Sequence, residues 1–270
     1  MTHFTLSFIG GGNMARALVG GLVAAGHAAD SITVADPDAG QRAALADDLG
    51  IQPVADNADA ARAKRVVVLA VKPQIIDQVL KDIASHLDAQ TVVISVAAGV
   101  TLATLEAALG RERALVRAMP NTPALFGAGM TGLVANSAAG SEDRDLAGHV
   151  FSAAGATAWI EDEALMDVIT AVSGSGPAYF FSLTEHLARA GAEAGLAPEL
   201  AARLARQTAV GAGVMLGRSE LDAGELRARV TSPGGTTAAA LEQFASDGFE
   251  RIIDRAVAAA VRRGRELGAG

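Results

Sequence analysis

The sequence predicts an α/β fold, with a doubly wound sheet over residues 1–162 and an all-helical domain over residues 163–270. Three observations carry this prediction. Apolar runs of strand length alternate with amphipathic stretches up to about residue 160, which is typical of a parallel sheet covered by helices. A glycine cluster joins the first strand to the first helix. Beyond Asp162 only helical spacing of apolar residues remains.

Each strand of the first part is expected from a short apolar run, and each helix from apolar residues at helical spacing. Residues 66–71 form a continuous β-branched run, as in a strand buried on both faces. Gly26 and Gly50 fit the ends of the first two helices. The expected strands are 4–9, 32–35, 66–71, 91–96, 115–118, 130–135 and 157–160, and the expected helices are 13–25, 38–49, 73–87, 102–109 and 141–154.

The second part reads as helices throughout. Gly195 followed by Pro198 marks the end of one helix and the start of the next. Two glycine-bearing interruptions, at residues 173–177 and 232–237, separate other helical stretches. The expected helices are 164–172, 177–194, 198–216, 222–230, 236–244 and 249–267.

Composition excludes several classes of protein. The 270 residues carry a net charge of −8 and no cysteine, which argues against a nucleic-acid binder, a disulfide framework and a thiolate metal site. The five histidines are scattered, without the spacing of a metal site. No targeting segment or apolar stretch of membrane-spanning length stands out. We therefore expect a cytoplasmic protein with no metal, no membrane contact and no nucleic-acid partner.

The glycine cluster Gly10-Gly11-Gly12-Asn13-Met14-Ala15 has the spacing G-x-G-x-x-A. It follows a strand and opens a helix, which is the context of a Rossmann-type dinucleotide site. Gly10 permits the tight turn, and Gly12 lets a pyrophosphate approach the backbone. The alternative is a glycine-rich turn that binds nothing.

Asp36 at the end of the second strand bears on which dinucleotide binds. A carboxylate there accepts hydrogen bonds from a ribose 2′-hydroxyl, which suits NADH, and repels a 2′-phosphate. Arg42 lies six residues on and could reach such a phosphate, although a solvated arginine on a helix face is the simpler interpretation. The residues favour NADH modestly and leave NADPH open.

Two further segments lie where strands end, at the edge of an open α/β sheet where ligands bind. Lys72 interrupts apolar surroundings between the third strand and a helix, and it either faces the cofactor or caps a loop. The small residues Val96, Ala97 and Ala98 would let a nicotinamide lie close to the backbone. Asn57 fits either an adenosine contact or a helix N-cap.

Three loops further along are candidates for ligand contact. Met119-Pro120-Asn121-Thr122-Pro123 is a rigid turn that is either ligand-facing or a connector. Residues 173–179 open a helix with Ser175 as an expected N-cap, and they line a cleft or pack helices closely. Ser232-Pro233-Gly234-Gly235-Thr236-Thr237 offers backbone N–H groups and hydroxyls that could hold a carboxylate and a ring nitrogen.

Taken together and in order, these motifs resemble pyrroline-5-carboxylate reductases along essentially the whole chain. The resemblance implies reduction of L-1-pyrroline-5-carboxylate to L-proline by NADPH or NADH, the last step of proline biosynthesis. It implies a homodimer through the carboxyl-terminal helices, and five such dimers commonly form a decamer. One departure is Asp36, where family members that prefer NADPH often carry a small polar residue or arginine.

The resemblance and the motifs together give the expected site residues. Thr237 is the expected catalytic residue, because its hydroxyl could hydrogen-bond the imine nitrogen. Expected substrate contacts are Ser175, Glu220, Ser232, Gly234, Gly235, Thr236 and Thr237, and expected cofactor contacts are Ile9, Gly10, Gly11, Gly12, Asn13, Met14, Asp36, Asn57, Ala70, Val71, Lys72, Pro73, Val96, Ala97 and Ala98.

Two other functions were weighed against this one. A 3-hydroxyacid dehydrogenase also pairs a dinucleotide domain with a helical one, but it needs a lysine on the helix after its second glycine loop. The helix after Gly176 has none. A catalytically idle nucleotide-binding regulator would leave the glycine loop at residues 232–237 unexplained.

Overall fold

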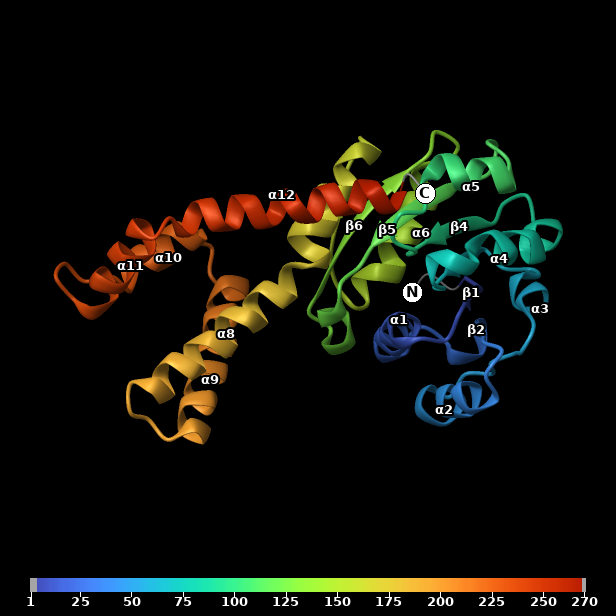
Figure 1. The fold of residues 1–270 in the computed structure, drawn as a ribbon. Helices are drawn as coiled ribbons and strands as arrows, with labels where there is room; N and C mark the ends of the chain where they lie inside the picture. The colour runs from blue at the N-terminus through green and yellow to red at the C-terminus, as the bar shows by residue number, and fades with distance from the viewer. Residues whose placement is uncertain (1–3, 269–270) are drawn as a thin grey trace. The chain divides into compact units, whose positions relative to one another are not determined.

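The computed structural model describes residues 4–268 and divides into two compact units. The first contains the chain up to Gly174 together with the residues from Ala260 onward, and the second contains Ser175–Ala259. The predicted domains, 1–162 and 163–270, rest on sequence pattern rather than on compactness, and this division stays a prediction. Figure 1 labels the elements of both units.

A single seven-stranded sheet forms the centre of the first unit, in the order β2-β1-β3-β4-β5-β6-β7. Each strand lies within a residue or two of its predicted position, which confirms the α/β class. The strands are β1 (Leu6–Ile9), β2 (Ile32–Ala35), β3 (Val66–Leu69), β4 (Val92–Ser95), β5 (Leu115–Met119), β6 (Gly129–Ala135) and β7 (Gly155–Trp159).

The sheet is mainly parallel, as predicted, with one exception that the alternation of strands and helices did not indicate: β6 runs antiparallel to β5. The connection between these strands contains only the short 3₁₀ turn Thr122–Phe126. A parallel neighbour needs a crossover of a dozen or more residues, whereas a short connection returns the chain antiparallel. Parallel pairing resumes between β6 and β7, which α6 (Ser141–Ser152) connects.

Helices cover both faces of the sheet, and each face has its own apolar core. Alternate residues of β1 go to opposite cores, with Leu6 and Phe8 in one and Ile9 in the other, as the two-residue period of a strand requires. The first core is covered by α1 (Asn13–Ala24), α2 (Ala39–Leu49) and α6, and the second by α3 (Asn57–Ala61), α4 (Ile76–Ile83), α5 (Leu102–Leu109) and α7 (Met166–Ile169).

The second unit is helical throughout, as predicted. Within Ser175–Ala259 only Gly176, Ala201, Ala205 and Gly248 are buried, whereas Phe181, Leu187 and other large apolar side chains are exposed. Helices with so little core need a further surface to pack against. They are α8 (Gly176–Glu193), α9 (Pro198–Arg218), α10 (Ala223–Arg229), α11 (Thr236–Ser246) and α12 (Phe249–Gly268), the last of which runs on into residues of the first unit.

The packing of α1 depends on Gly21. A Cβ atom placed there would lie 2.4 Å from the carbonyl oxygen of Ala153, whereas one on Gly20 would meet only a Leu49 methyl at 3.5 Å. Backbone cannot yield as a flexible side chain can, so α1 approaches the end of α6 only with a glycine at position 21.

We predict that Gly21→Ala destabilises the protein by about 1–3 kcal/mol, because the added methyl group overpacks the contact with Ala153. Gly20→Ala in the same helix is the matched control, and it should raise stability by about 0.5–1 kcal/mol through helix propensity alone. Urea denaturation followed by circular dichroism measures both variants. Equal midpoints for the two variants would contradict the close packing of α1.

Candidate functional site

The turn between β1 and α1 brings three strand ends together. Gly10 adopts φ +99, and its N–H donates to the Ala35 carbonyl of β2 at 2.8 Å. A Cβ on Gly10 would lie 2.6 Å from the Ala70 carbonyl oxygen beyond β3. Both the conformation and the space therefore require glycine here. The predicted cofactor residues at the ends of β1, β2 and β3 accordingly lie at one edge of the sheet.

Neither the backbone conformation nor the surrounding space requires a glycine at position 12. The Gly12 backbone, at φ −69 and ψ −174, is open to any residue, and a Cβ there would meet nothing within 4 Å. Gly12 is exposed and precedes α1, with no side-chain cap on the helix. The chain itself therefore has no use for a glycine at this position. Free space beside uncapped N–H groups at a helix start fits a dinucleotide pyrophosphate.

Asp36 is fixed beside the same turn. Its Oδ2 accepts from the Gly11 N–H at 2.9 Å, and its Oδ1 accepts from the Asp38 N–H, also at 2.9 Å. The carboxylate is therefore oriented by backbone donors rather than turned away, and it adds negative charge next to the glycine turn. Gln41 supports the arrangement, because its Nε2 donates to the Gly11 carbonyl at 2.8 Å.

Arg42 is also held at this edge. Its Nη1 donates to the carbonyl oxygens of Asp36 at 2.7 Å and Pro37 at 2.9 Å. The interpretation of Arg42 as a solvated arginine on a helix face is therefore wrong, because these two carbonyls draw the guanidinium onto the chain just after β2. A carboxylate and a guanidinium thus share the region where a ribose 2′ substituent is expected.

The other predicted cofactor residues take varied positions. Lys72 is exposed and precedes the 3₁₀ turn Pro73–Ile75. After β4, Ala97 is buried and Ala98 is exposed, and the Ala97 N–H donates to Ser95 Oγ at 3.3 Å. Asn57 is not an N-cap, because Asp56 caps α3 and the Asn57 amide donates to Asp82 at 3.3 Å. Whether these residues contact a cofactor stays a prediction.

The loop at residues 119–123 is held by its own asparagine. Asn121 is buried, its Oδ1 accepts from the Met130 N–H at 2.9 Å, and its Nδ2 donates to the Ser173 carbonyl at 3.0 Å. Ser173 lies in a π-helical turn, Thr170–Gly174, just before the second unit. Asn121 therefore connects the loop to this turn, so the connector interpretation accounts for the asparagine.

The glycine loop of the second unit is a turn that starts α11. The Gly235 N–H donates to the Ser232 carbonyl at 3.0 Å, and Gly234 adopts φ +70. Proline followed by a positive-φ glycine at the centre is typical of a type II turn, so the turn alone explains Gly234. Thr236 and Thr237 then form the first turn of α11, with Thr237 half-buried and no side-chain cap before them.

Two other predicted substrate residues also belong to the second unit. Ser175 lies at the N-cap position of α8, as expected, but its side chain makes no cap hydrogen bond. Glu220 is exposed after α9. Their contact with substrate stays a prediction.

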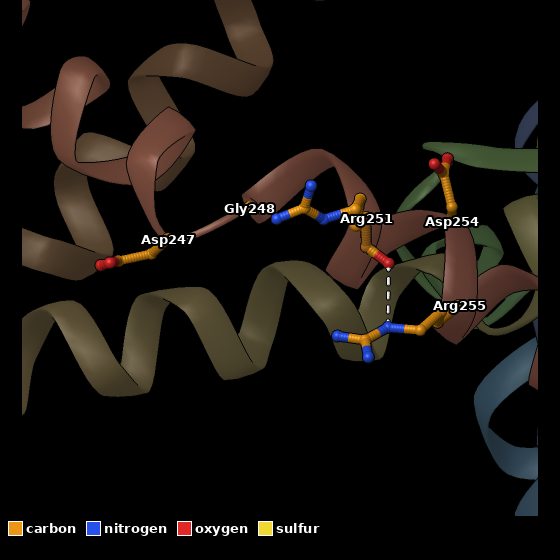
Figure 2. A pocket seen from close by; sticks show the side chains of 5 residues that line it. All are labelled: Asp247, Gly248, Arg251, Asp254 and Arg255. Atoms are coloured by element: carbon orange, nitrogen blue, oxygen red, sulfur yellow. Dashed lines mark hydrogen bonds between the residues drawn. The ribbon is translucent and has the colours of Figure 1, made fainter.

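A cavity of about 390 Å³ in the second unit was not predicted from sequence. Asp247, Gly248, Arg251, Asp254 and Arg255 line it, and Figure 2 shows both guanidinium groups with the bond from Arg255 Nε to the Arg251 carbonyl, 3.2 Å long. Gly248 adopts φ +73 in the turn that shapes this cavity. In the sequence, the glycine itself is the feature that could have indicated this turn. None of the predicted site residues lines this cavity.

Lys64 is a partly buried lysine away from the predicted site. Burial lowers the pKa of Lys64, whose Nζ donates to Thr33 Oγ1 at 2.8 Å. This lysine precedes β3 and so lies at the opposite sheet edge from the glycine turn.

Among residues 4–268, no group of three or more His, Asp or Glu side chains could hold a metal ion, and no helix is long and apolar enough to cross a membrane.

The doubly wound sheet, the open glycine turn and the oriented acid after β2 are features of dinucleotide-dependent oxidoreductases, and residues 5–99 match a family model of an NADP oxidoreductase. Comparison with known proteins gives the family. The chain is 48% identical to pyrroline-5-carboxylate reductase of Pseudomonas aeruginosa over 97% of this chain and 96% of that one. This protein belongs to the pyrroline-5-carboxylate reductase family.

Solved structures and family models agree with this assignment. A pyrroline-5-carboxylate reductase from Coxiella burnetii matches with a TM-score of 0.93 and 40% identity, over 98% of this chain and 99% of that one. The Plasmodium falciparum enzyme, solved with NADP bound, matches with a TM-score of 0.85 and 32% identity over 99% of each chain. Residues 5–99 match the model "NADP oxidoreductase coenzyme F420-dependent", and residues 163–267 match "Pyrroline-5-carboxylate reductase dimerisation".

We predict that Gly12→Ala keeps the fold, with at most a small loss of stability because alanine is a poorer N-cap than glycine, and weakens dinucleotide binding. The methyl group meets no atom of the chain, but it occupies the space that the pyrophosphate needs. Thermal unfolding without ligand should stay close to that of the wild type, while the Kd for NADPH, measured by fluorescence titration, should rise at least about tenfold. An unchanged Kd would show that the pyrophosphate lies elsewhere.

Proposed function

We propose that this protein reduces the imine of L-1-pyrroline-5-carboxylate to L-proline with NADPH or NADH, completing proline biosynthesis. The observation that carries the proposal is the open space at Gly12, in a chain that matches pyrroline-5-carboxylate reductases over nearly its whole length. The likeness to the Plasmodium structure, which has NADP bound, supports a nicotinamide dinucleotide as the cofactor.

The first unit holds the dinucleotide in this proposal. Within the turn from Gly10 to Met14, the N–H groups at the start of α1, from Gly12 onward, bind the pyrophosphate, because those of Gly10 and Gly11 are already bonded within the protein. The end of β2 faces the adenosine ribose. The small residues after β4 leave room for the nicotinamide, which supplies the hydride when bound. The remaining expected contacts are Ile9, Asn57 and the segment from Ala70 to Pro73.

The second unit holds the substrate and handles its proton. The free N–H groups at the start of α11 suit the substrate carboxylate, and the Thr237 hydroxyl oxygen accepts a hydrogen bond from the protonated ring nitrogen. The carbon of the protonated C=N bond gains a hydride, the π electrons pass to the nitrogen, and the nitrogen keeps its proton as the N–H of the product, so a hydroxyl that orients this group suffices. Glu220, on the amine side, and Ser175 complete the proposed contacts with the turn from Ser232 to Thr236.

The direct test is an assay of NADPH and NADH oxidation, followed at 340 nm, on adding L-1-pyrroline-5-carboxylate. The expected result is substrate-dependent oxidation with proline as the product. A 3-hydroxy acid assayed with NAD⁺ tests the dehydrogenase alternative. Dinucleotide binding with no turnover of either substrate would favour the idle regulator and overturn the proposal.

The proposal includes a homodimer through the carboxyl-terminal helices, assembled further into a decamer. The dimerisation model matches residues 163–267, and α8, α9 and α12 expose Phe181, Leu204 and Ile252. Analytical ultracentrifugation distinguishes a monomer, a dimer and a decamer by mass. The acidic, cysteine-free chain supports a cytoplasmic location, which fractionation of cells would test.

Replacing Thr237 by valine is predicted to lower kcat by about 100-fold, because the isosteric side chain cannot hydrogen-bond the imine nitrogen. Thr184→Val is the matched control, since the Thr184 hydroxyl is engaged by the Phe180 carbonyl at 2.7 Å in α8. Steady-state kinetics and thermal unfolding are measured for both. Wild-type kcat and KM in Thr237→Val would refute the assignment of Thr237.

Asp36→Asn is predicted to raise the ratio of kcat/KM for NADPH to that for NADH by about tenfold, because it removes a negative charge from the expected 2′-phosphate site. The amide oxygen still accepts one of the two backbone hydrogen bonds of Asp36, and the other is lost. Asp38→Asn is the control, since asparagine caps α2 as well as aspartate does. A strong NADPH preference in the wild type, unchanged in Asp36→Asn, would contradict the electrostatic argument.

A further inference from the structure

One carboxylate oxygen holds two separate parts of the first unit. Oε1 of Glu163 accepts from Arg117 Nη1 of β5 at 2.9 Å and from the backbone N–H of Leu102, the first residue of α5, also at 2.9 Å. The Arg117 side chain is 9% exposed and that of Glu163 is 27% exposed. The interaction is therefore largely shielded from water, and removal of either partner would leave the other charge poorly compensated.

The Leu102 N–H that Glu163 binds ends the connection between β4 and α5. That connection contains Val96, Ala97 and Ala98, the residues expected beside the nicotinamide. Its near end is bonded to β3 through the Val96 N–H and the Leu69 carbonyl at 3.1 Å, and the side chains of Ala97 and Val100 are buried in the second core. Its hydrogen bonds within itself are long: the Ala97 N–H donates to Ser95 Oγ and the Val100 N–H to the Ala97 carbonyl, both at 3.3 Å. At its far end Glu163 supplies the polar anchor.

The end of α12 packs against the middle of this loop. Gly99 adopts φ +79, and a Cβ there would lie 3.0 Å from the carbonyl oxygen of Leu267. This contact lies within the first unit. The backbone of α12 therefore limits the loop at Gly99, and the Glu163 carboxylate binds its end at the Leu102 N–H. The position of the loop depends in part on Glu163, because this residue keeps the start of α5 in place.

We propose that Glu163 is a positioning residue for the reaction, because it fixes the loop after β4 against which the nicotinamide half of the dinucleotide packs. The inference rests on the proposed function, since that function places the nicotinamide at this loop. Arg117 in turn holds the Glu163 carboxylate. The adenosine and pyrophosphate contacts, at the ends of β1 and β2, use none of these groups.

Loss of the Glu163 anchor should lower the rate of turnover while leaving the affinity for the dinucleotide nearly unchanged. When the anchor is lost, the loop moves and the nicotinamide is oriented less well, and displacement of a reacting group by about 1 Å can cost about 100-fold in rate. The Kd of the dinucleotide should stay within about twofold of the wild type, because its other half binds at independent contacts. A residue that only stabilised the fold would change neither quantity among correctly folded molecules.

The test compares Glu163→Gln and Glu163→Ala with Glu161→Gln. Glutamine keeps an oxygen for the Leu102 N–H but removes the charge opposite Arg117, whereas alanine removes both. Glu161 is the matched control, because its ion pair with Arg144 is 3.5 Å long and its side chain is 85% exposed. Three quantities are measured: amide hydrogen exchange of residues 96–102 without ligand, the Kd for NADPH, and kcat with the primary deuterium isotope effect.

The expected results are faster exchange at residues 96–102, an unchanged Kd and a kcat lowered by about 10- to 100-fold in Glu163→Ala. The isotope effect should rise, Glu163→Gln should be intermediate, and Glu161→Gln should match the wild type. Unchanged exchange at the loop, or a fall in NADPH affinity equal to the fall in kcat, overturns the role of Glu163. If instead the wild-type protein fails to turn over pyrroline-5-carboxylate, the proposed function fails, while the exchange data still decide whether Glu163 anchors the loop.

Should Glu163→Ala not fold, Arg117→Gln provides a second variant. It removes the charge that holds Glu163 and leaves the Glu163–Leu102 hydrogen bond possible. The same pattern is expected in a milder form, and wild-type exchange and kcat in this variant would contradict the part assigned to Arg117.

Discussion

The close approach of the β1–α1 turn to the ends of β2 and β3 is the constraint on which the rest of the site depends. Gly10 can lie against Ala70 and Ala35 only because it has no side chain and adopts a positive φ. That approach places Gly12 beside open space rather than against protein. The same turn brings the Gly11 N–H to Asp36, so one backbone conformation sets both the pyrophosphate space and the acid beside it.

The loops around this edge are held by single polar side chains. Asn121 joins β6 to the π-helical turn before the second unit, and Glu163 joins β5 to the start of α5. Each satisfies backbone groups that the nearby strands and helices leave unpaired, and so adds to the apolar contacts that already hold these loops. Charged and polar residues outside the expected contacts thus determine where the contacting residues lie.

Sequence pattern predicted the strands well because a strand buried on both faces is a continuous β-branched run, as in β3. It missed α3, because five residues rich in alanine show no clear period. The reversal of β6 was missed as well, since pattern gives the position of a strand but not its direction. The glycine turn could be recognised because each small residue meets a distinct spatial demand.

Long-range polar partners could not be predicted. Nothing local tells that Arg42 folds back onto the Asp36 and Pro37 carbonyls, or that Glu163 reaches Leu102 across 61 positions of the chain. Ser175 is a related case, because it occupies the N-cap position that the sequence predicted but its side chain makes no cap hydrogen bond. Such interactions depend on the assembled sheet, and no short motif encodes them.

The proposed function requires above all that the dinucleotide pyrophosphate binds in the free space at Gly12. A crystal structure of the protein with bound NADPH tests it directly. The predicted result is a pyrophosphate oxygen about 3 Å from the backbone nitrogen of Gly12 or Asn13, at the start of α1. A pyrophosphate bound away from this turn, with the space beside Gly12 filled only by solvent, would contradict the account.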